Sequence, residues 1–280
     1  PLLLMIGWRG EPGKKDEPQH KKMGRVMLPM LDILEIPHEI LSENIDEAEE
    51  QIKKAKEYMD KNNAPFAIII KKGMFEPYTL KTKTEQNYEM NREDAVKVVI
   101  DSMKGNEAIV STTGKTSREL FEYREEKNQG HGFDFLTVGS MGFSSSIAYG
   151  VATQTKKPVY IFDGDGAVIM HMGALTTIGS SKQSNIYHII FDNEAYDSTG
   201  AQPTLSPNTD FCPIAKACGY KEAKRVSTKQ DLITTLAEMQ NTEGPYLLVI
   251  GINKGARKDL GRPTTTPIEN KEAFMQFLQK

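Results

Sequence analysis

Residues 159–204 read VYIFDGDGAVIMHMGALTTIGSSKQSNIYHIIFDNEAYDSTGAQPT and hold the clearest pattern in the chain. An apolar run at 159–162 stops at Asp163-Gly164-Asp165-Gly166, which predicts a buried strand running into a loop. Apolar residues then recur at helical spacing, and a second apolar run at 186–191 stops at Asp192-Asn193. This order of strand, helix and strand predicts a βαβ unit with parallel strands.

Asp165 and Asn193 follow the two strands directly, so we expect both at the carboxyl edge of the sheet. Neighbouring parallel strands lie about 4.8 Å apart, which lets a carboxylate and an amide oxygen reach one hard cation such as magnesium or calcium. A helix starting near Ala167 would direct free N–H groups to the same place and favour an anion. The pattern therefore predicts a cation bridged to a diphosphate.

Simpler interpretations exist for these motifs. A lone Gly-Asp-Gly is most often only a turn. An EF-hand is excluded, because counting from Asp163 places Val168 where that loop requires glycine and Ala174 where it requires glutamate. Residues 113–116, TGKT, end like a phosphate-binding P-loop, but Ile109 stands where its first glycine belongs, so an ATPase is excluded.

The Gly-Asp-Gly motif followed one strand later by a terminal asparagine resembles the signature of thiamine diphosphate enzymes. This resemblance implies that Asp165 and Asn193 bind Mg²⁺ together with the backbone carbonyl of Ala195. It also implies that Gly166 and Ala167 donate N–H groups to the diphosphate.

Two upstream turns extend the resemblance. Gly139-Ser140-Met141-Gly142 is similar to the family's GxMG turn, which implies that Met141 wedges between the two cofactor rings and that the Gly139 carbonyl faces the aminopyrimidine. The alternative is that Met141 is an ordinary core methionine. The turn containing Gly114 and Thr116 resembles another cofactor-contacting turn of the family's decarboxylases.

Alternating strands and helices predict an α/β fold, an open and mostly parallel sheet with helices on both faces. We expect residues 91–280 to form the diphosphate- and metal-binding domain, with strands at 108–112, 135–138, 159–162, 186–191 and 246–250. A polar linker spans 73–90. Residues 1–72 resemble the C-terminal part of a pyrimidine-binding domain, with a strand at 2–6, a long polar loop at 8–24, a helix capped by Ser42 and a strand at 65–70.

The resemblance also implies what surrounds the site. The family activates its cofactor with a glutamate that precedes the segment beginning at Pro1, so this chain is expected to lack an N-terminal segment and not to decarboxylate alone. The family builds each site between two subunits, which implies a homo-oligomer with the active site at the interface. His20 lies in the loop that carries histidines in relatives acting on pyruvate, which predicts a catalytic role, whereas the alternative is a surface histidine.

Segments spread over nearly the whole chain resemble one branch of the family, and this resemblance indicates the substrate. WRGEPGKKDEPQH at 8–20, KGMFEPY at 72–78 and YDSTGAQPT at 196–204 resemble the branch of thiamine diphosphate decarboxylases that converts 3-phosphonopyruvate to phosphonoacetaldehyde and carbon dioxide. Departures at Glu194 and Tyr196, where that branch has glycine and histidine, border the site. The alternatives are a sulfopyruvate decarboxylase and a non-catalytic or partial subunit of a thiamine diphosphate enzyme. The implied substrate is a 2-oxo acid with a second anionic group.

Composition is compatible with such an enzyme. The chain has 280 residues, 38% of them apolar, and 35 basic against 38 acidic residues without a basic cluster, which argues against nucleic acid or an anionic membrane as partner. Cys212 and Cys218 lack the companions of a zinc site or disulfide framework and indicate ordinary thiols of the cytoplasm. The apolar residues 1–6 are too short for a membrane span.

Overall fold

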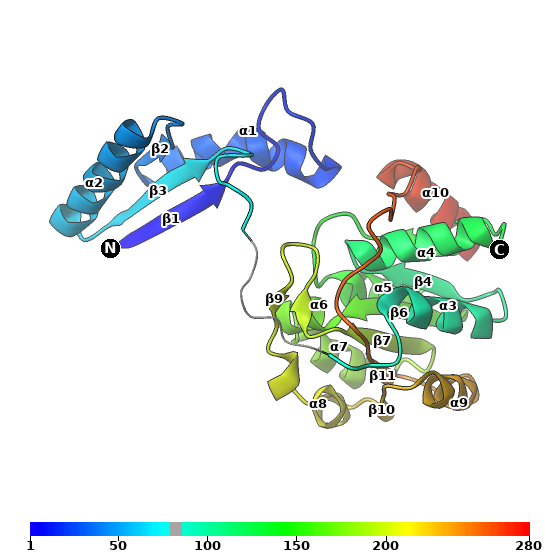
Figure 1. Ribbon diagram of the computed structural model, residues 1–280. Helices are drawn as coiled ribbons and strands as arrows, with labels where there is room; N and C mark the ends of the chain where they lie inside the picture. Colours follow the sequence, from blue (N-terminus) through cyan, green and yellow to red (C-terminus); the bar gives the residue numbers. More distant parts are fainter. Residues whose placement is uncertain (79–85) are drawn as a thin grey trace. The chain divides into compact units, whose positions relative to one another are not determined.

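The computed structural model describes residues 1–78 and 86–280 of the chain (Figure 1). Contacts divide the chain into two compact units, Pro1–Lys83 and Thr84–Lys280. Within the described residues, no helix has both the length and the apolar character needed to cross a membrane.

The second unit is built on a six-stranded sheet in which every neighbouring pair is parallel. The order of its strands is β10-β11-β7-β6-β4-β5. Their bounds are β4 Ala108–Ser111, β5 Asp134–Leu136, β6 Val159–Gly164, β7 Ile186–Asp192, β10 Glu222–Val226 and β11 Tyr246–Gly251.

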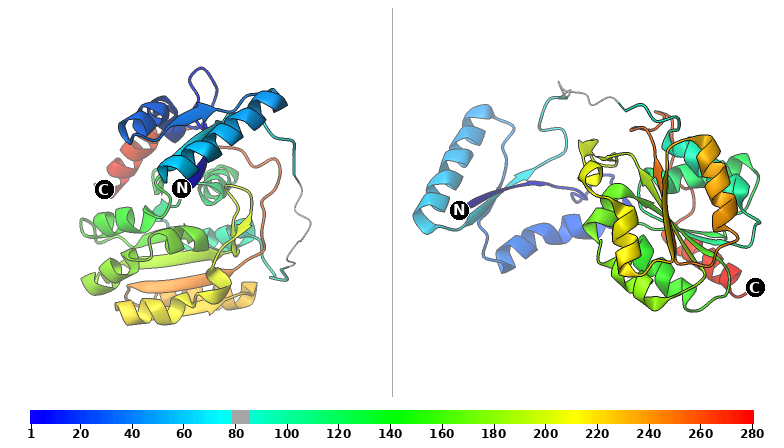
Figure 2. Two further views of the ribbon diagram at one scale, coloured as in Figure 1. Left: turned by 90° about the vertical axis from the view of Figure 1, so that its left-hand side faces the viewer. Right: turned by 90° about the horizontal axis from the view of Figure 1, so that it is seen from below.

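Side chains of the central strands alternate between two apolar cores, one on each face of this sheet. In β6, Tyr160 and Phe162 enter one core and Val159 and Ile161 enter the other. Burial on both faces explains why these strands are continuous apolar runs in the sequence. The predicted open parallel sheet with helices on both faces is confirmed (Figure 2).

Helices α3 (Arg92–Ser102), α4 (Lys115–Glu126) and α9 (Lys229–Met239) supply buried residues to one core. Helices α5 (Ser144–Ala152), α7 (Ala174–Ser181), α8 (Phe211–Cys218) and α10 (Pro267–Leu278) supply the other, and the short α6 (Asp165–Met170) adds Val168 to it. A small antiparallel hairpin, β8 (Ala195–Tyr196) and β9 (Gln202–Pro203), follows β7, and a 3-10 turn spans Ser206–Asn208. Cys212 and Cys218 are free thiols.

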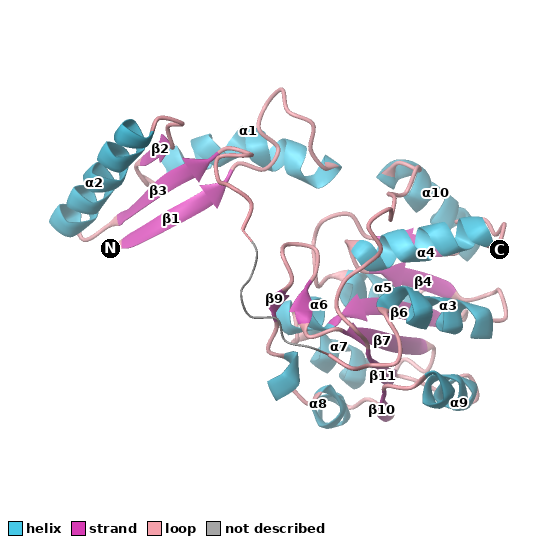
Figure 3. Ribbon diagram, viewed as in Figure 1, coloured by secondary structure: helices cyan, strands magenta, loops and turns pink. Residues whose placement is uncertain are grey.

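The first unit is a three-stranded parallel sheet in the order β1-β3-β2, with β1 Leu2–Gly7, β2 His38–Ile40 and β3 Pro65–Ile70 (Figure 3). Helix α1 (Pro18–Ile33) packs Leu31 against Ala67 and Ile69. Helix α2 (Ile45–Asn62) packs Ala55 against Phe66 and Ile68. Since Ile68 and Ile69 are neighbours in β3, the two helices cover opposite faces of the sheet.

The predicted loop at 8–24 was wrong in its second half, because α1 already begins at Pro18. Gly24 lies inside this helix, where a Cβ would stand 1.9 Å from the carbonyl oxygen of Gly10, so glycine permits the preceding loop to cross the helix closely. The indole of Trp8 donates a hydrogen bond of 2.8 Å to the Gly24 carbonyl across the same contact. In the sequence, Gly24 suggests a loop. In the structure it lies in a helix, and the close packing of Gly10 requires glycine there.

Two helix boundaries also differ from those predicted. Ser42 is not the cap of α2, because Asn44 accepts hydrogen bonds from the N–H groups of Asp46 and Glu47. The helix expected to start near Ala167 begins at Asp165 and is interrupted after Met170, and α7 starts anew at Ala174. Helix α3 begins after Asn91, which forms a capping box with Asp94.

Candidate functional site

A pocket lies at the carboxyl ends of β4, β6 and β7. Strand β6 delivers Gly164 and Asp165 to it, β7 delivers Asn193, and the turn after β4 delivers Thr112 and Thr113. Its lining residues are Arg92, Thr112, Thr113, Lys115, Thr116, Met141, Gly164, Asp165, Gly166, Ala167, Phe191, Asn193, Ala195, Tyr196, Asp197 and Ser198. The topology therefore brings the two halves of the predicted cation site into one cavity.

Asp165 is a buried carboxylate held by neutral hydrogen-bond donors. Its side chain accepts a hydrogen bond of 2.5 Å from the Thr204 hydroxyl, and the residue is 1% exposed. Burial raises the pKa of Asp165 to about 7, although the bond from Thr204 and the N–H groups of Gly166 and Asn193 favour its ionised form. A cation beside this carboxylate would remove much of the cost of its ionisation.

Asn193 and Ala195 stand beside Asp165 on the segment that follows β7. Both residues are buried. The Asn193 Oδ1 accepts the N–H of Ala195 at 3.2 Å, and the Ala195 carbonyl accepts the N–H of Asp197 at 3.0 Å. Each of these oxygens keeps a second lone pair, so each can still serve as a ligand of a hard cation.

The preceding Asp192 anchors this segment to the sheet. Its carboxylate accepts hydrogen bonds of 2.5 Å from the Ser206 hydroxyl and from the Arg225 guanidinium. Because Asp192 already has a cationic partner, it does not compete with Asp165 for a metal ion. The last residue of β7, Asp192, is thus structural, and the next residue, Asn193, lines the pocket.

Gly166, in the first turn of α6, lies against Tyr196 of the hairpin. A Cβ at this position would lie 2.4 Å from the Tyr196 ring and 3.3 Å from the Thr204 methyl group. The glycine thus lets the aromatic ring lie against the start of α6, where Gly166 and Ala167 line the pocket.

We expect Gly166→Ala to weaken binding of thiamine diphosphate, because the added methyl group must displace Tyr196 and the segment carrying Ala195. Displacing groups that orient metal ligands costs about 10- to 100-fold in affinity. Titration of the cofactor at fixed Mg²⁺ measures the change. Gly173→Ala is the matched control, since Gly173 lies outside the pocket and a Cβ there meets nothing within 4 Å. Equal affinity of both variants would contradict the proposed role of this contact.

The turn before α4 forms a second wall of the pocket. Gly114 has φ 111° and ψ −142°, a conformation open to glycine, and precedes the helix that begins at Lys115. Thr116 is buried and lines the pocket, whereas Gly114 lies beside it, where a Cβ would stand 3.6 Å from the Ser198 side chain. The buried Thr112 hydroxyl has no hydrogen-bond partner within the described part of the chain and also borders the pocket.

The turn containing Gly139 and Met141 contributes a third wall. Met141 is half-buried and lines the pocket, which does not fit an ordinary core methionine. The Gly139 N–H lies 3.4 Å from the Thr113 hydroxyl, which joins this turn to the one before α4. Gly142 has φ 89°, and a Cβ there would overlap His171, so glycine allows the turn to pack on the end of α6.

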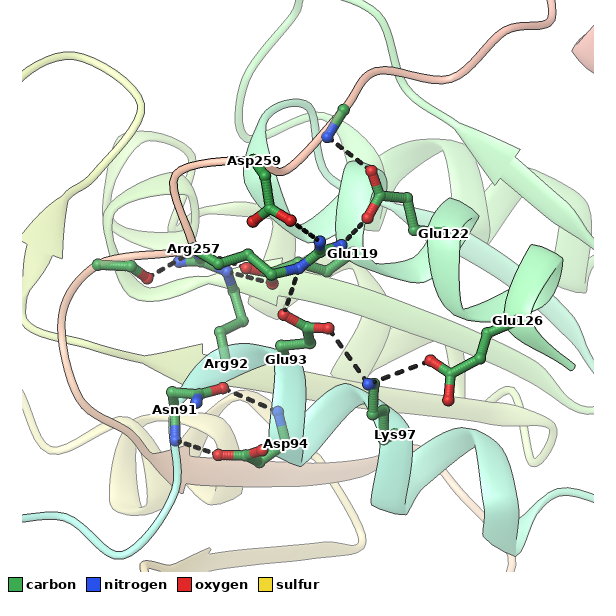
Figure 4. A network of polar contacts seen from close by, with 12 residues as sticks. Asn91, Arg92, Glu93, Asp94, Lys97, Glu119, Glu122, Glu126, Arg257 and Asp259 are labelled. Atoms are coloured by element: carbon green, nitrogen blue, oxygen red, sulfur yellow. Dashed lines mark hydrogen bonds and ion pairs between the residues drawn. The ribbon is translucent and has the colours of Figure 1, made fainter.

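Sequence reasoning missed a buried ion triad, two members of which, Arg92 and Asp197, line the pocket. The Arg92 guanidinium donates to Glu119 at 2.8 and 3.1 Å and to Asp197 at 3.2 Å. Figure 4 shows Arg92 reaching Glu119 from the start of α3, beside the more exposed network of Arg257, Glu93 and Lys97. No motif indicated this triad, because its members lie on three elements far apart in the sequence. Lys115 also lines the pocket and was set aside with the P-loop.

His20 belongs to the first unit, in the first turn of α1. Its Nδ1 lies 2.9 Å from Asp16, whose carboxylate also binds Arg9 through two hydrogen bonds of 2.6 and 3.0 Å. The Arg9 guanidinium holds the pKa of Asp16 far below its usual range. The imidazole is therefore oriented by a carboxylate that stays ionised, and its placement at the active site remains a prediction.

The donor set fits a hard cation with a diphosphate. It combines a buried carboxylate, a carboxamide oxygen and a backbone carbonyl, which are the oxygen ligands that Mg²⁺ and Ca²⁺ prefer. Among the described residues, no group of three or more His, Cys, Asp or Glu side chains is arranged to share a metal ion.

The chain is similar to known thiamine diphosphate enzymes. Residues 112–250 match the family model "Thiamine pyrophosphate enzyme, C-terminal TPP binding domain". A phosphonopyruvate decarboxylase from Streptomyces viridochromogenes is 33% identical over 293 residues, covering 99% of this chain and 72% of the relative. The sulfopyruvate decarboxylase subunit beta of Methanococcus maripaludis is 32% identical over 193 residues, covering 69% of this chain and 100% of that subunit.

A solved structure supports the same fold. The thiamine diphosphate-dependent 4-hydroxybenzoylformate decarboxylase of Rhodococcus jostii RHA1 matches with a TM-score of 0.52 and 19% identity. The match covers 66% of this chain, and the chain spans only 37% of that enzyme.

Proposed function

This chain belongs to the phosphonopyruvate decarboxylase family of thiamine diphosphate enzymes, and we propose that it acts in the decarboxylation of 3-phosphonopyruvate to phosphonoacetaldehyde and carbon dioxide. The observation that carries the proposal is the similarity to the Streptomyces enzyme, because it extends over both units and not over the cofactor motif alone. The pocket at the end of β6 and β7 supports it with a fitting donor set.

The second unit would hold the cofactor through Mg²⁺. Asp165, Asn193 and the Ala195 carbonyl supply the protein ligands, and the N–H groups of Gly166 and Ala167 bind the diphosphate. When bound, thiamine diphosphate supplies the electron sink that lets the bond to the leaving carboxylate break. Met141, Gly139, Gly114 and Thr116 border the rest of the cofactor in this proposal.

The first unit would contribute to substrate handling. His20, oriented by Asp16, is a group that can take up or release a proton near neutral pH. Cationic side chains between β1 and the middle of α1 suit a substrate that carries both a carboxylate and a phosphonate. They are Arg9, Lys14, Lys15, Lys21, Lys22 and Arg25. We further propose that the active protein is a homo-oligomer whose active site forms between subunits, and that it resides in the cytoplasm.

A substrate panel tests the proposal. The complete polypeptide is assayed with phosphonopyruvate, sulfopyruvate and pyruvate, with thiamine diphosphate and Mg²⁺ added or withheld, and the released aldehyde is identified. We expect phosphonopyruvate to give the highest kcat/KM and turnover to require both additions. A higher kcat/KM for sulfopyruvate would assign the alternative suggested by the Methanococcus relative. Cofactor binding without turnover of any 2-oxo acid would favour a partial subunit.

His20→Gln separates a catalytic from a surface role in the same assay. We expect decarboxylation to fall by about 10²- to 10⁴-fold, the usual contribution of a general acid or base, with unchanged Mg²⁺ affinity. Full activity of this variant would remove His20 from the proposed site. His38, a histidine of the same unit that begins β2, is the matched control for loss of an imidazole.

A further inference from the structure

Glu194 separates the two predicted oxygen donors of the segment after β7 and has an unusual backbone. Its φ is 57°, in the left-handed region that residues other than Gly, Asn and Asp seldom adopt. This conformation turns the chain between Asn193 and Ala195, so both residues line the same pocket. The orientation of the peptide groups on either side of Glu194 therefore depends on a backbone conformation that glutamate disfavours.

Two side chains from the start of the second unit bind the Glu194 carboxylate. Gln86 Nε2 donates to Glu194 Oε2 at 2.8 Å and to the Asn193 carbonyl oxygen at 3.0 Å. The Tyr88 hydroxyl donates to Glu194 Oε1 at 2.9 Å. Burial, followed by the bond to Glu194, raises the pKa of Tyr88 to about 12, so the phenol remains a donor at neutral pH.

Both donors are themselves fixed to the end of β11. Gln86 Oε1 accepts the N–H of Lys254 at 3.0 Å. Asn253 binds the backbone of Tyr88 on both sides, accepting its N–H at 3.1 Å and donating to its carbonyl at 2.6 Å. The Tyr88 ring lies against Gly251, where a Cβ would stand 2.7 Å from it. The carboxylate is thus held by a rigid support and not by two mobile surface side chains.

We propose that Gln86 and Tyr88 are positioning residues of the cation site, which hold Glu194 in the left-handed conformation and thereby direct the Asn193 and Ala195 oxygens toward Asp165. The inference rests on the proposed function of the pocket. It assigns a role in cofactor binding to residues that precede the segment matched by the family model. Glu194 acts through the backbone in this proposal, and its charge is not a ligand of the cation.

The test measures cation binding directly. Mn²⁺ is titrated into the whole protein and followed by electron paramagnetic resonance, first alone and then with saturating thiamine diphosphate, and Mg²⁺ is used to displace it. We expect Glu194→Ala to weaken Mn²⁺ binding by about 10- to 100-fold, the range for residues that orient metal ligands. Gln86→Ala and Tyr88→Phe should each weaken it less, because each leaves one bond to Glu194.

Two conservative variants separate positioning from charge. Glu194→Gln keeps a hydrogen-bonding group for Gln86 and Tyr88 but removes the negative charge, so its Mn²⁺ affinity should stay close to wild type. Glu194→Gly adopts the left-handed conformation without strain but has no side chain to hold, so its affinity should lie between those of wild type and Glu194→Ala. If Glu194→Gln binds Mn²⁺ as weakly as Glu194→Ala, the charge acts directly and the proposal is wrong.

Lys182→Ala is the matched backbone control. Lys182 also has a left-handed conformation, with φ 55°, but it ends α7 and does not line the pocket. This variant should leave both the melting temperature and the Mn²⁺ affinity close to wild type, because alanine and lysine both carry a Cβ and Lys182 is exposed. Circular dichroism checks that Glu194→Ala is folded. If this folded variant binds Mn²⁺ with wild-type affinity, the inference is wrong, but the proposed function is not affected. Absence of saturable Mn²⁺ binding in the wild-type protein would instead overturn the proposed function.

Discussion

Asp165→Ala is expected to abolish Mg²⁺-dependent binding of thiamine diphosphate, with a loss of about 100-fold or more in cofactor affinity. The variant removes the buried carboxylate of the proposed cation site, and the neighbouring Asp192 cannot replace it, because that carboxylate is already paired with Arg225. Calorimetric titration of the cofactor at several Mg²⁺ concentrations gives the measurement. Unchanged affinity that still rises with Mg²⁺ would mean that the cation binds elsewhere.

The same variant is expected to fold normally. Burial already disfavours the ionised form of Asp165, so its removal relieves the free protein of a costly buried charge. The melting temperature without Mg²⁺ should therefore stay at or above that of wild type. Asp165→Asn serves as the control of shape, since it keeps an acceptor for the Thr204 hydroxyl and loses only the charge. Both variants should lose the increase in melting temperature that Mg²⁺ and cofactor produce in wild type.

Arg92→Met is expected to cause a large loss of stability, about 3–5 kcal/mol, because it leaves the buried carboxylates of Glu119 and Asp197 without their cation. Asp197 also accepts the Gly255 N–H at 3.0 Å and donates its own N–H to the Ala195 carbonyl. Its release should therefore weaken cofactor binding as well. Urea unfolding and cofactor titration measure the two effects separately.

Arg124→Met is the matched control for this prediction. Arg124 forms a buried pair with Asp134 at 2.9 and 3.0 Å, with nearly the same side-chain exposure as Arg92, but it does not line the pocket. We expect a similar loss of stability with cofactor affinity retained at temperatures where the variant is folded. Equal losses of affinity in the two variants would show that instability alone weakens binding, and would contradict a specific role for Arg92.

The sequence predicted the central sheet and its carboxyl edge well, for a physical reason. Strands buried on both faces are mostly apolar, so β6 and β7 are distinct runs whose carboxyl ends are marked by Asp163 and Asp192, with the buried His188 as an exception inside β7. Asp165 and Asn193 stand at those ends, and parallel pairing leaves one edge where both can lie. Local rules sufficed there because the strand, its end and the following residue are contiguous in the chain.

The sequence did not predict features that depend on distant residues. Helix α1 contains Gly24 and Pro29, which normally indicate a loop, and only contact with Gly10 explains the glycine. Arg92 gave no signal, because its partners Glu119 and Asp197 are defined by tertiary packing. Strand β10 was also missed, since its edge position leaves most of its residues partly exposed and its sequence, EAKRV, is polar.

The parallel order of the six strands has a consequence for where this unit can be divided. A fragment trimmed to the boundaries of the matched family, 112–250, would retain Asp165, Asn193 and Ala195. It would nevertheless lose β4, which pairs with both β5 and β6 in the interior of the sheet. It would also lose helix α3 with its buried apolar face. The segment matched by the family model thus contains the proposed cation ligands but is shorter than the polypeptide needed to fold the sheet that holds them.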